Sequence, residues 1–408
     1  MAPALKFLHA ADLHLDRVME GLTEIPAHLK STLANAGYQA AEHVVAVALA
    51  ERVDCVLLAG DVVDLEQGGP RAATFLQSQF QRLADKQIPV FWCGGAVDHL
   101  DRWPSAATLP SNVTMLSSSY FERHVIAKQG KPLATLFGAG FYPGRQAFVD
   151  IHVASDDPFP IVLCHEPGGE LPESLPVRYW ALGGQHDARI QERGGSTVVY
   201  PGTPQSRAPQ EIGRHTCAVV HVDGTGRIRV EPTVTDGVRW LPQTLGFAES
   251  ASDDEIRNLF AERALQLLAE VPEHLGLVTW SLETTGEISP RLRTAAWREG
   301  MLRWLRAEFG AAAKGLWTVD LQFSGTRPLP RAWFEEDTML GDYLQAVGRY
   351  QAEPELAVHL HAYLPTALGD ERLASLGRLD ESHRADVLQQ AALVGVERLG
   401  MWSDEAQG

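Results

Sequence analysis

Four short apolar runs in the chain are each followed by aspartate or histidine. The runs and the residues after them are Leu5–Ala10 with Asp12 and His14, Cys55–Ala59 with Asp61 and Asp64, Ile161–Cys164 with His165, and Tyr179–Leu182 with His186. The length and β-branched content of these runs are typical of strands buried on both faces of a sheet. Ligands of open α/β sheets bind beyond the carboxyl ends of the strands, so these side chains are expected to meet at one place.

Carboxylates and imidazoles in one cluster are suited to binding a transition metal. Mixed oxygen and nitrogen ligands favour Mn, Fe or Zn, whereas all-oxygen sets favour Mg or Ca and thiolate sets favour structural zinc. In Asp12-Leu13-His14 both polar side chains can reach one ion, and Asp61 at the next strand end can bridge two. A lone Asp-x-His is usually a turn or a helix cap, and a lone histidine after a strand is usually structural. The occurrence of all four elements in order is what predicts a metal site.

The segments that position these side chains alternate between apolar runs and stretches of helical periodicity. Two such stretches, Leu33–Arg52 and Arg71–Lys86, lie between the early runs, and further runs continue to about residue 240. This alternation predicts an α/β layered domain with helices outside a central sheet. After Trp240, a strand-helix-strand-helix-strand order predicts a small α+β module, with Ser252 as the N-cap of its first helix. Farther on, Leu and Ala recur at helical spacing, which predicts a helical C-terminal region.

Length and composition set limits on the class of protein. With 408 residues, 45% apolar and 21% charged, the chain is expected to fold as two or three globular domains. A formal net charge of -17 restricts any polyanion surface to a local basic patch or to metal ions. The four cysteines form no Cys-x-x-Cys pair, which argues against a disulfide scaffold and for a reducing compartment. Without a secretory signal pattern or a membrane-spanning apolar window, we expect a cytoplasmic protein with no membrane partner.

Several motifs together resemble the calcineurin-like metallophosphoesterases, and among them the DNA repair exonucleases of the SbcD and YhaO type. The matching segments are Lys6-Phe7-Leu8-His9-Ala10-Ala11-Asp12-Leu13-His14-Leu15-Asp16, Leu58-Ala59-Gly60-Asp61-Val62-Val63-Asp64, Leu136-Phe137-Gly138-Ala139-Gly140-Phe141-Tyr142 and Tyr200-Pro201-Gly202-Thr203-Pro204-Gln205-Ser206-Arg207. The resemblance implies a four-layer α/β/β/α sandwich for residues 1–240. It also implies a capping domain over 241–325 and a helical region over 326–408 that could dock on a partner.

The resemblance implies two divalent ions, but only one complete set of ligands. The first ion would be held by Asp12, His14, His186 and the bridging Asp61, all of which are present. The second ion would share Asp61 with His165. Two more ligands expected for it, an asparagine and a histidine, are Ala96 and Gly184 in this chain, and neither side chain can coordinate. Manganese is the ion expected, with Fe, Zn and Mg as alternatives.

The residue expected to assist the scissile phosphate is also replaced. The family has a histidine where this chain has Val97, and general acid help of that kind is worth about a hundredfold or more. We name His99, two residues on, and Asp64, after the same strand as Asp61, as candidate catalytic residues. Basic loop residues that could contact phosphates are Arg145, Arg178, Arg207 and Arg214.

Three functions remain open from the sequence. The first is a metal-dependent phosphodiesterase that hydrolyses DNA with a metal-activated water, through a local DNA-binding patch. The second is a catalytically impaired homologue that binds DNA ends or an ATPase partner, which the residues Ala96, Val97 and Gly184 motivate. The third is a phosphatase for small molecules or phosphoproteins. Family resemblance further implies an SMC-like ATPase as partner of the helical region, and a homodimer.

Overall fold

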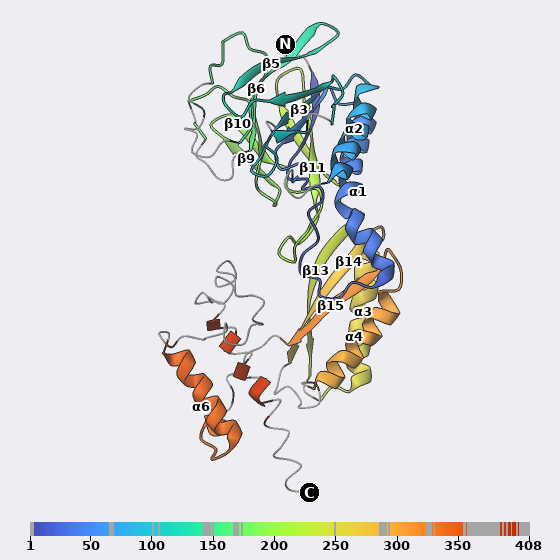
Figure 1. The fold of residues 1–408 in the computed structure, drawn as a ribbon, viewed down its shortest axis with the longest axis vertical. Helices are drawn as coiled ribbons and strands as arrows, with labels where there is room; N and C mark the ends of the chain where they lie inside the picture. The colour runs from blue at the N-terminus through green and yellow to red at the C-terminus, as the bar shows by residue number, and fades with distance from the viewer. Residues whose placement is uncertain are drawn as a thin grey trace. The chain divides into compact units, whose positions relative to one another are not determined.

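Figure 1 shows a computed structural model of the chain, drawn from the N-terminus in blue to the C-terminus in red. It describes residues 4–353 except 65–68, 100–101, 105–106, 142–147, 149–150, 166–170, 173, 249, 285–291, 293, 324–328 and 330; beyond 353 it describes 356, 384–385, 387–388, 391–392, 394–396 and 399. The chain divides into two compact units. The first comprises Met1–Gln243, Phe260–Trp280 and Leu305–Asp320, and the second Thr244–Leu259, Ser281–Trp304 and Leu321–Gly408.

The first sheet has six strands in the order β12-β11-β1-β2-β3-β4. Its strands are β1 (Leu5–Ala10), β2 (Cys55–Ala59), β3 (Val90–Cys93), β4 (Val113–Leu116), β11 (Thr216–Val222) and β12 (Ile228–Val234). Strands β1 to β4 are parallel, and β11 runs antiparallel to β1. All residues of β2 and β3 are buried, as the continuous apolar runs predict. The parallel strands end at one edge, from which the segments with Asp12 and Asp61 continue.

The second sheet also has six strands, in the order β5-β6-β7-β8-β10-β9. Its strands are β5 (Glu122–Lys128), β6 (Lys131–Ala139), β7 (Pro160–His165), β8 (Tyr179–Gly183), β9 (Arg189–Arg193) and β10 (Ser196–Tyr200). Strands β6, β7, β8 and β10 are parallel, and the edge strands β5 and β9 are antiparallel to their neighbours. His165 therefore ends β7, opposite Gly183 at the end of β8.

The two sheets pack face to face around one apolar core. Leu57 of β2 and Leu163 of β7 belong to this core, and the rings of Phe7 and Tyr179 meet edge to face with centroids 5.0 Å apart. Strand β2 contacts both β7 and β8. This packing brings the ends of the parallel strands of one sheet next to those of the other, which is where the sequence predicts the metal ligands.

Helices cover the outer face of the first sheet. α1 (Ala27–Glu51) and α2 (Pro70–Ala84) bury apolar side chains such as Val44 and Phe80 against the sheet. Pro70 occupies the first turn of α2, where its missing N–H costs nothing. On the outer face of the second sheet, Trp180 packs with Phe148 and Ile151, and the described residues there form no helix. The predicted α/β class with two stacked sheets is confirmed.

The predicted strand-helix-strand-helix-strand order follows the sandwich. The elements are β13 (Val238–Phe247), α3 (Asp253–Glu270), β14 (Leu275–Thr284), α4 (Ala295–Phe309) and β15 (Leu316–Phe323), with the sheet order β13-β14-β15. Trp240 and Leu277 pack against Leu29 of α1. Ser252 caps α3 as predicted, because its hydroxyl accepts from Glu255 N while the Glu255 carboxylate accepts from Ser252 N. The domain boundaries at residues 240 and 325 stay predictions.

Most of the described residues of the C-terminal region are helical. α5 (Arg331–Phe334) and α6 (Met339–Ala352) are followed by helical residues between 384 and 399. The side chain of Thr338 accepts a hydrogen bond from Gly341 N and thereby caps α6. Most of the predicted helical segments beyond residue 353 lie outside the described residues. Among the described helices, none has the length and apolar character needed to cross a membrane.

Candidate metal centre

Unusual backbone geometry aims three of the predicted side chains at one place. The φ angle is +54° at Asp12, +42° at His14 and +51° at Asp61, in the left-handed region that residues other than glycine seldom adopt. Two hydrogen bonds tie these loops together: Asp12 N donates to Gly60 O at 3.0 Å, and His14 N to Asp61 O at 2.8 Å. Left-handed residues cost about 1–3 kcal/mol each and persist where surroundings impose them, often at functional sites.

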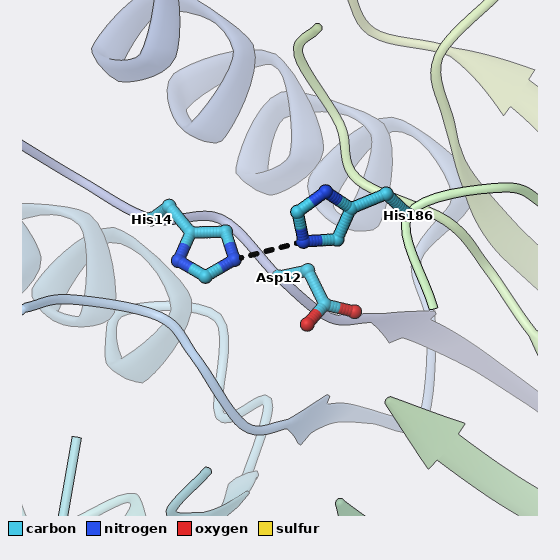
Figure 2. A group of neighbouring side chains, drawn as sticks. All are labelled: Asp12, His14 and His186. Atoms are coloured by element: carbon cyan, nitrogen blue, oxygen red, sulfur yellow. Dashed lines mark hydrogen bonds between the residues drawn. The ribbon is translucent and has the colours of Figure 1, made fainter. Parts of the chain in front are cut away.

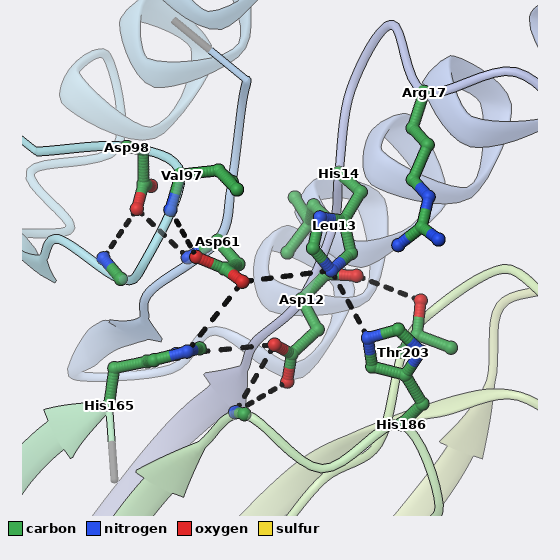
Figure 3. Close-up of polar contacts among 12 residues, drawn as sticks. Asp12, Leu13, His14, Arg17, Asp61, Val97, Asp98, His165, His186 and Thr203 are labelled. Atoms are coloured by element: carbon green, nitrogen blue, oxygen red, sulfur yellow. Dashed lines mark hydrogen bonds and ion pairs between the residues drawn. The ribbon is translucent and has the colours of Figure 1, made fainter. Parts of the chain in front are cut away.

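A buried aspartate, Asp98, holds the loop that carries Asp61. Its carboxylate accepts hydrogen bonds from the N–H of Asp61 at 3.0 Å and of Val62 at 2.8 Å, and from the indole of Trp92 at 3.1 Å. Burial raises the pKa of Asp98 to about 7, although the backbone N–H groups of Val62 and Asp61 act in the opposite direction. The Val97 N–H donates to Asp61 Oδ1 at 3.0 Å, as Figure 3 shows. Asp61 is therefore held through both its backbone and its carboxylate.

His165 faces the two aspartates with a fixed ring orientation. Its Nδ1 lies 3.0 Å from the carbonyl oxygen of Ala59, and its Nε2 lies 3.6 Å from Asp61 Oδ2. A carbonyl oxygen only accepts, so Nδ1 carries the proton and Nε2 keeps its lone pair. That lone pair is the one a metal ion needs. Nδ1 is also 4.0 Å from Asp12 Oδ1, which places His165 beside both carboxylates.

His14 and His186 meet from opposite sides of the site. Figure 2 shows the two imidazoles facing each other above Asp12, with their Nε2 atoms 3.2 Å apart. His14 Nε2 is also 3.9 Å from Asp61 Oδ2. Burial, assisted by the positive charge of Arg207, lowers the pKa of His14 to about 3, so this imidazole is neutral and able to coordinate.

The five predicted ligands form two overlapping groups. One consists of Asp12, His14 and His186, and the other of Asp12, Asp61 and His165; within each, the possible ligand atoms lie within 4.8 Å of one another. Burial raises the pKa of Asp12 well above its ordinary value, and an adjacent cation would stabilise its charged form. Carboxylate oxygens and neutral imidazole nitrogens fit Mn, Fe or Zn. The donor set therefore fits a divalent transition metal, and we call these five residues the metal centre.

Backbone amides take part at two positions where the family resemblance implies functional side chains, a metal ligand at Gly184 and a phosphate-assisting histidine at Val97. Gly184 N donates to both carboxylate oxygens of Asp12, at 3.2 and 3.0 Å, and Val97 N donates to Asp61. Gly184 has φ +88°, a conformation that suits glycine better than histidine. Ala96 is exposed. Gly184 and Val97 thus contribute N–H donors that orient Asp12 and Asp61. The side chains at Gly184, Val97 and Ala96 add no metal ligand.

The two candidate catalytic residues belong to neither ligand group. The ring of His99 lies 6.4 Å from that of Phe141, and Phe141 in turn lies edge-on to His165 at 6.0 Å. His99 therefore packs against an aromatic neighbour of the metal centre. Asp64 is half-buried just after Val63, which bridges to Leu15. The catalytic roles of His99 and Asp64 stay predictions.

Some site residues were missed by sequence reasoning, and one was given a different role. Arg207 was expected to contact phosphate, but it is buried and donates to the carbonyl oxygens of Leu13 and Gln205. Arg178 likewise donates to a backbone carbonyl, that of Gly226. Arg145 lies outside the described residues. Glu211, whose Oε1 is 2.5 Å from His186 Nδ1, follows no apolar run and matches no motif that would have identified it.

A cavity of about 410 Å³ opens next to the loop that carries His14. It is lined by four basic residues, one acidic residue and apolar residues such as Val18 and Leu33; the charged ones are Arg17, Lys30, Arg71, Arg207 and Asp16. Arg17 follows His14 by three positions, its positive charge contributes to the lowered pKa of His14, and its guanidinium extends toward the metal centre in Figure 3. This cavity, which we call the basic cavity, concentrates positive charge beside the site in an acidic protein.

Comparison with known proteins finds similarity to one family over the N-terminal region. Residues 5–200 match the model of the calcineurin-like phosphoesterases. Over 268 residues the chain is 30% identical to the uncharacterized metallophosphoesterase YhaO of Bacillus subtilis (strain 168), covering 61% of this chain and 65% of that protein. The chain thus spans less than two thirds of this relative.

Similar solved structures include the protein TT1561 of Thermus thermophilus and a dimetal phosphatase from Danio rerio. The first is 13% identical with a TM-score of 0.33 and covers 56% of this chain and 99% of the other. The second is 12% identical with a TM-score of 0.33 and covers 57% of this chain and 98% of the other. Likeness at this level bears on neither activity nor substrate.

Proposed function

We propose that the protein hydrolyses phosphodiester bonds of DNA with the help of a divalent metal ion, since residues 5–200 match the model of the calcineurin-like phosphoesterases. The observation that carries this proposal is the metal centre. Five Asp and His side chains from four distant segments meet at the strand ends, within reach of shared ions. Manganese is the proposed ion by resemblance to the family, and the mixed carboxylate and imidazole ligands fit it, as they also fit Fe or Zn.

The residues of the chain have separable roles in such a reaction. Asp12, His14, Asp61 and His186 would hold one ion, which when bound polarises a phosphoryl oxygen and supplies a hydroxide nucleophile at neutral pH. Gly184 N and Val97 N keep the carboxylates of Asp12 and Asp61 oriented. Glu211 and the carbonyl of Ala59 keep the protons of His186 and His165 on Nδ1, which leaves Nε2 free to coordinate.

The proposal of DNA as substrate is supported by three features. The Tyr200–Arg207 stretch resembles those of DNA repair exonucleases, and the α+β elements after residue 237 follow the order expected of their capping domain. The basic cavity adds cations that suit a phosphodiester backbone, since backbone neutralisation supplies much of the affinity of proteins for DNA. Lys30 and Arg17 are exposed there.

A second candidate function follows from the incomplete second site. Ala96 and Gly184 contribute no side-chain ligands, and Val97 cannot donate a proton to a leaving oxygen. A protein of this kind would bind DNA ends or an SMC-like ATPase, through the helical C-terminal region, without efficient turnover. A second copy of the chain is a further proposed partner, by resemblance to the dimeric nucleases.

Cleavage assays decide between the two functions. The full chain is incubated with Mn²⁺ and either double-stranded DNA or bis-p-nitrophenyl phosphate, beside Asp61→Ala as control. DNA cleavage by the wild type above the level of the variant is expected. No difference between them would overturn the enzyme proposal, and DNA-end binding without cleavage would then favour the second function. p-Nitrophenyl phosphate is tested in parallel. A protein that hydrolyses this monoester, leaves both diester substrates intact and does not bind DNA would be a phosphatase.

A further inference from the structure

Glu211 joins the imidazole of His186 to the backbone of the loop after β10. Its Oε1 lies 2.5 Å from His186 Nδ1, and its Oε2 accepts hydrogen bonds from the N–H of Arg207 at 2.5 Å and of Ala208 at 3.3 Å. Both carboxylate oxygens are therefore engaged, and the side chain of Glu211 is only 13% exposed. A carboxylate held at both oxygens cannot rotate, so the imidazole bound to it is held in one orientation.

This contact also decides which nitrogen of His186 can bind a metal. An ionised carboxylate only accepts hydrogen bonds, so Nδ1 must carry the proton that is shared with Glu211. Nε2 then keeps its lone pair, and this is the atom that lies 3.2 Å from His14 Nε2. Histidine ligands of metals commonly donate their other N–H to a carboxylate or carbonyl, which fixes the ring and raises its basicity.

The loop that carries Glu211 holds the other ligand segment as well. Thr203 Oγ1 donates to the carbonyl oxygen of Asp12 at 2.8 Å, and Thr203 N donates to that of His186 at 3.0 Å. Figure 3 shows Thr203 beside His186, with a dashed line from its hydroxyl to the carbonyl oxygen of Asp12. The Arg207 guanidinium donates to the carbonyl oxygen of Leu13. One loop thus contacts the backbone on both sides of the His14–His186 pair.

A buried histidine closes this loop on itself. The two ring nitrogens of His215 each lie 3.1 Å from a carbonyl oxygen, Nδ1 from that of Thr203 and Nε2 from that of Glu211. His215 therefore spans the loop between the residue that contacts Asp12 and the residue that contacts His186. The position of Glu211 is set by the fold and does not depend on a mobile side chain.

We propose that Glu211 is a positioning residue that orients His186 for metal binding, and that the loop from Thr203 to Glu211 fixes the distance between His186 and the Asp12–His14 segment. This inference rests on the proposed metal centre. It gives the Tyr200–Arg207 stretch a structural role in metal binding, in place of the phosphate contact that the sequence suggested for Arg207. Glu211 acts only through His186 and touches no reacting atom.

Metal affinity of variants tests the proposal independently of catalysis. Full-length wild type, Glu211→Ala and Glu211→Gln are freed of metal, and Mn²⁺ binding is measured by titration calorimetry. Loss of a residue that orients a ligand typically weakens metal binding about 10- to 100-fold, and we expect this loss in Glu211→Ala. The visible absorption of bound Co²⁺ should change in the same variant, because that spectrum reports the ligands around the ion. Glu211→Gln has nearly the same shape as the wild type and serves if Glu211→Ala does not fold.

Glu122→Ala is the matched control. Glu122 also pairs with a histidine, His124 at 2.8 Å, and also accepts from a backbone amide, that of Ser117 at 2.6 Å, but it belongs to neither ligand group. It should keep wild-type Mn²⁺ affinity. Equal affinity and Co²⁺ spectra in wild type and both Glu211 variants would overturn the proposal. A wild type that binds Mn²⁺ but does not cleave DNA would contradict only the proposed function. A wild type that binds neither Mn²⁺ nor Co²⁺ would contradict both the proposed function and the positioning role of Glu211.

Discussion

The Nε2 atoms of His14 and His186 lie 3.2 Å apart, although the two residues are separated by 172 positions in the sequence. Two lone pairs at this distance repel each other unless a proton or a cation lies between them. Asp12, beside both rings, supplies negative charge for a cation. The relationship makes His14 and His186 the pair whose loss should most affect metal binding.

His186→Ala is therefore predicted to abolish tight binding of the first ion. Removing a direct ligand should weaken Mn²⁺ affinity by more than the roughly 100-fold upper range for residues that only orient ligands. The measurement is titration calorimetry of the metal-free protein, with metal content after dialysis as a second readout. His124→Ala, at a half-buried histidine outside both groups, is the control. Unchanged Mn²⁺ affinity in His186→Ala would mean that the ion binds elsewhere.

Restoring the family's ligands is predicted to strengthen the second site. Ala96→Asn adds an amide oxygen at an exposed position, and Val97→His adds a proton donor. The double variant should bind a second Mn²⁺ and hydrolyse bis-p-nitrophenyl phosphate about a hundredfold faster than the wild type, the usual worth of general acid catalysis. Gly184→His is less suitable, because its φ of +88° strains any side chain. If the double variant still binds one ion and hydrolyses bis-p-nitrophenyl phosphate at the wild-type rate, the geometry of the loop limits the second site, and the missing side chains do not.

The sequence predicted the central strands and the ligand positions because both depend on short-range pattern. β1 and β2 have the predicted bounds, since each is a buried apolar run followed closely by polar residues. The edge strand β9 was not predicted, because all its residues are exposed and it contains no apolar run. Edge strands commonly carry charged residues that prevent pairing with other chains.

Other parts of the site depend on the path of the loops in three dimensions, which short-range sequence patterns do not predict. Glu211 reaches His186 because the chain after β10 folds back over the ligand loops, so no spacing rule could identify it. Arg207 was expected at a phosphate because it lies in a loop, yet its guanidinium is buried beside α1, where a side chain on Gly37 would collide with it. Asp98 was not among the predicted site residues, because its four hydrogen bonds appear only in three dimensions.

Acid is predicted to destabilise the fold through His9, a buried histidine that belongs to neither ligand group. Burial lowers the pKa of His9 to about 3, from 6.5 in the unfolded chain. Above pH 6.5 both states are neutral; as the pH falls from 6.5 toward 3, the unfolded state alone gains a proton and stability decreases. Between pH 7.5 and 5.5 this linkage should lower the free energy of unfolding by about 1.4 kcal/mol. The measurement is urea unfolding at both pH values.

His9→Gln provides the comparison for that measurement. Glutamine does not titrate, so the decrease between the two pH values should be smaller by about the same 1.4 kcal/mol, even if the variant is less stable overall. His9 Nδ1 contacts Tyr179 Oη at 3.1 Å, and the variant will lose packing there. An identical pH dependence in wild type and variant would show that other groups account for the acid sensitivity.

The basic cavity is predicted to contribute to DNA binding through charge. Replacing both Arg17 and Lys30 by alanine should weaken binding of a DNA duplex and reduce the slope of log K against log salt by about one unit for each phosphate that is no longer neutralised. Arg229→Ala is the control, because Arg229 is an exposed arginine of β12 that pairs with Glu231 at 3.0 Å. Fluorescence anisotropy at several salt concentrations, with the metal-free protein, separates this effect from cleavage. If the double variant binds DNA with the affinity and salt slope of the wild type, the strand does not pass through the basic cavity, and the substrate must reach the metal centre by another side.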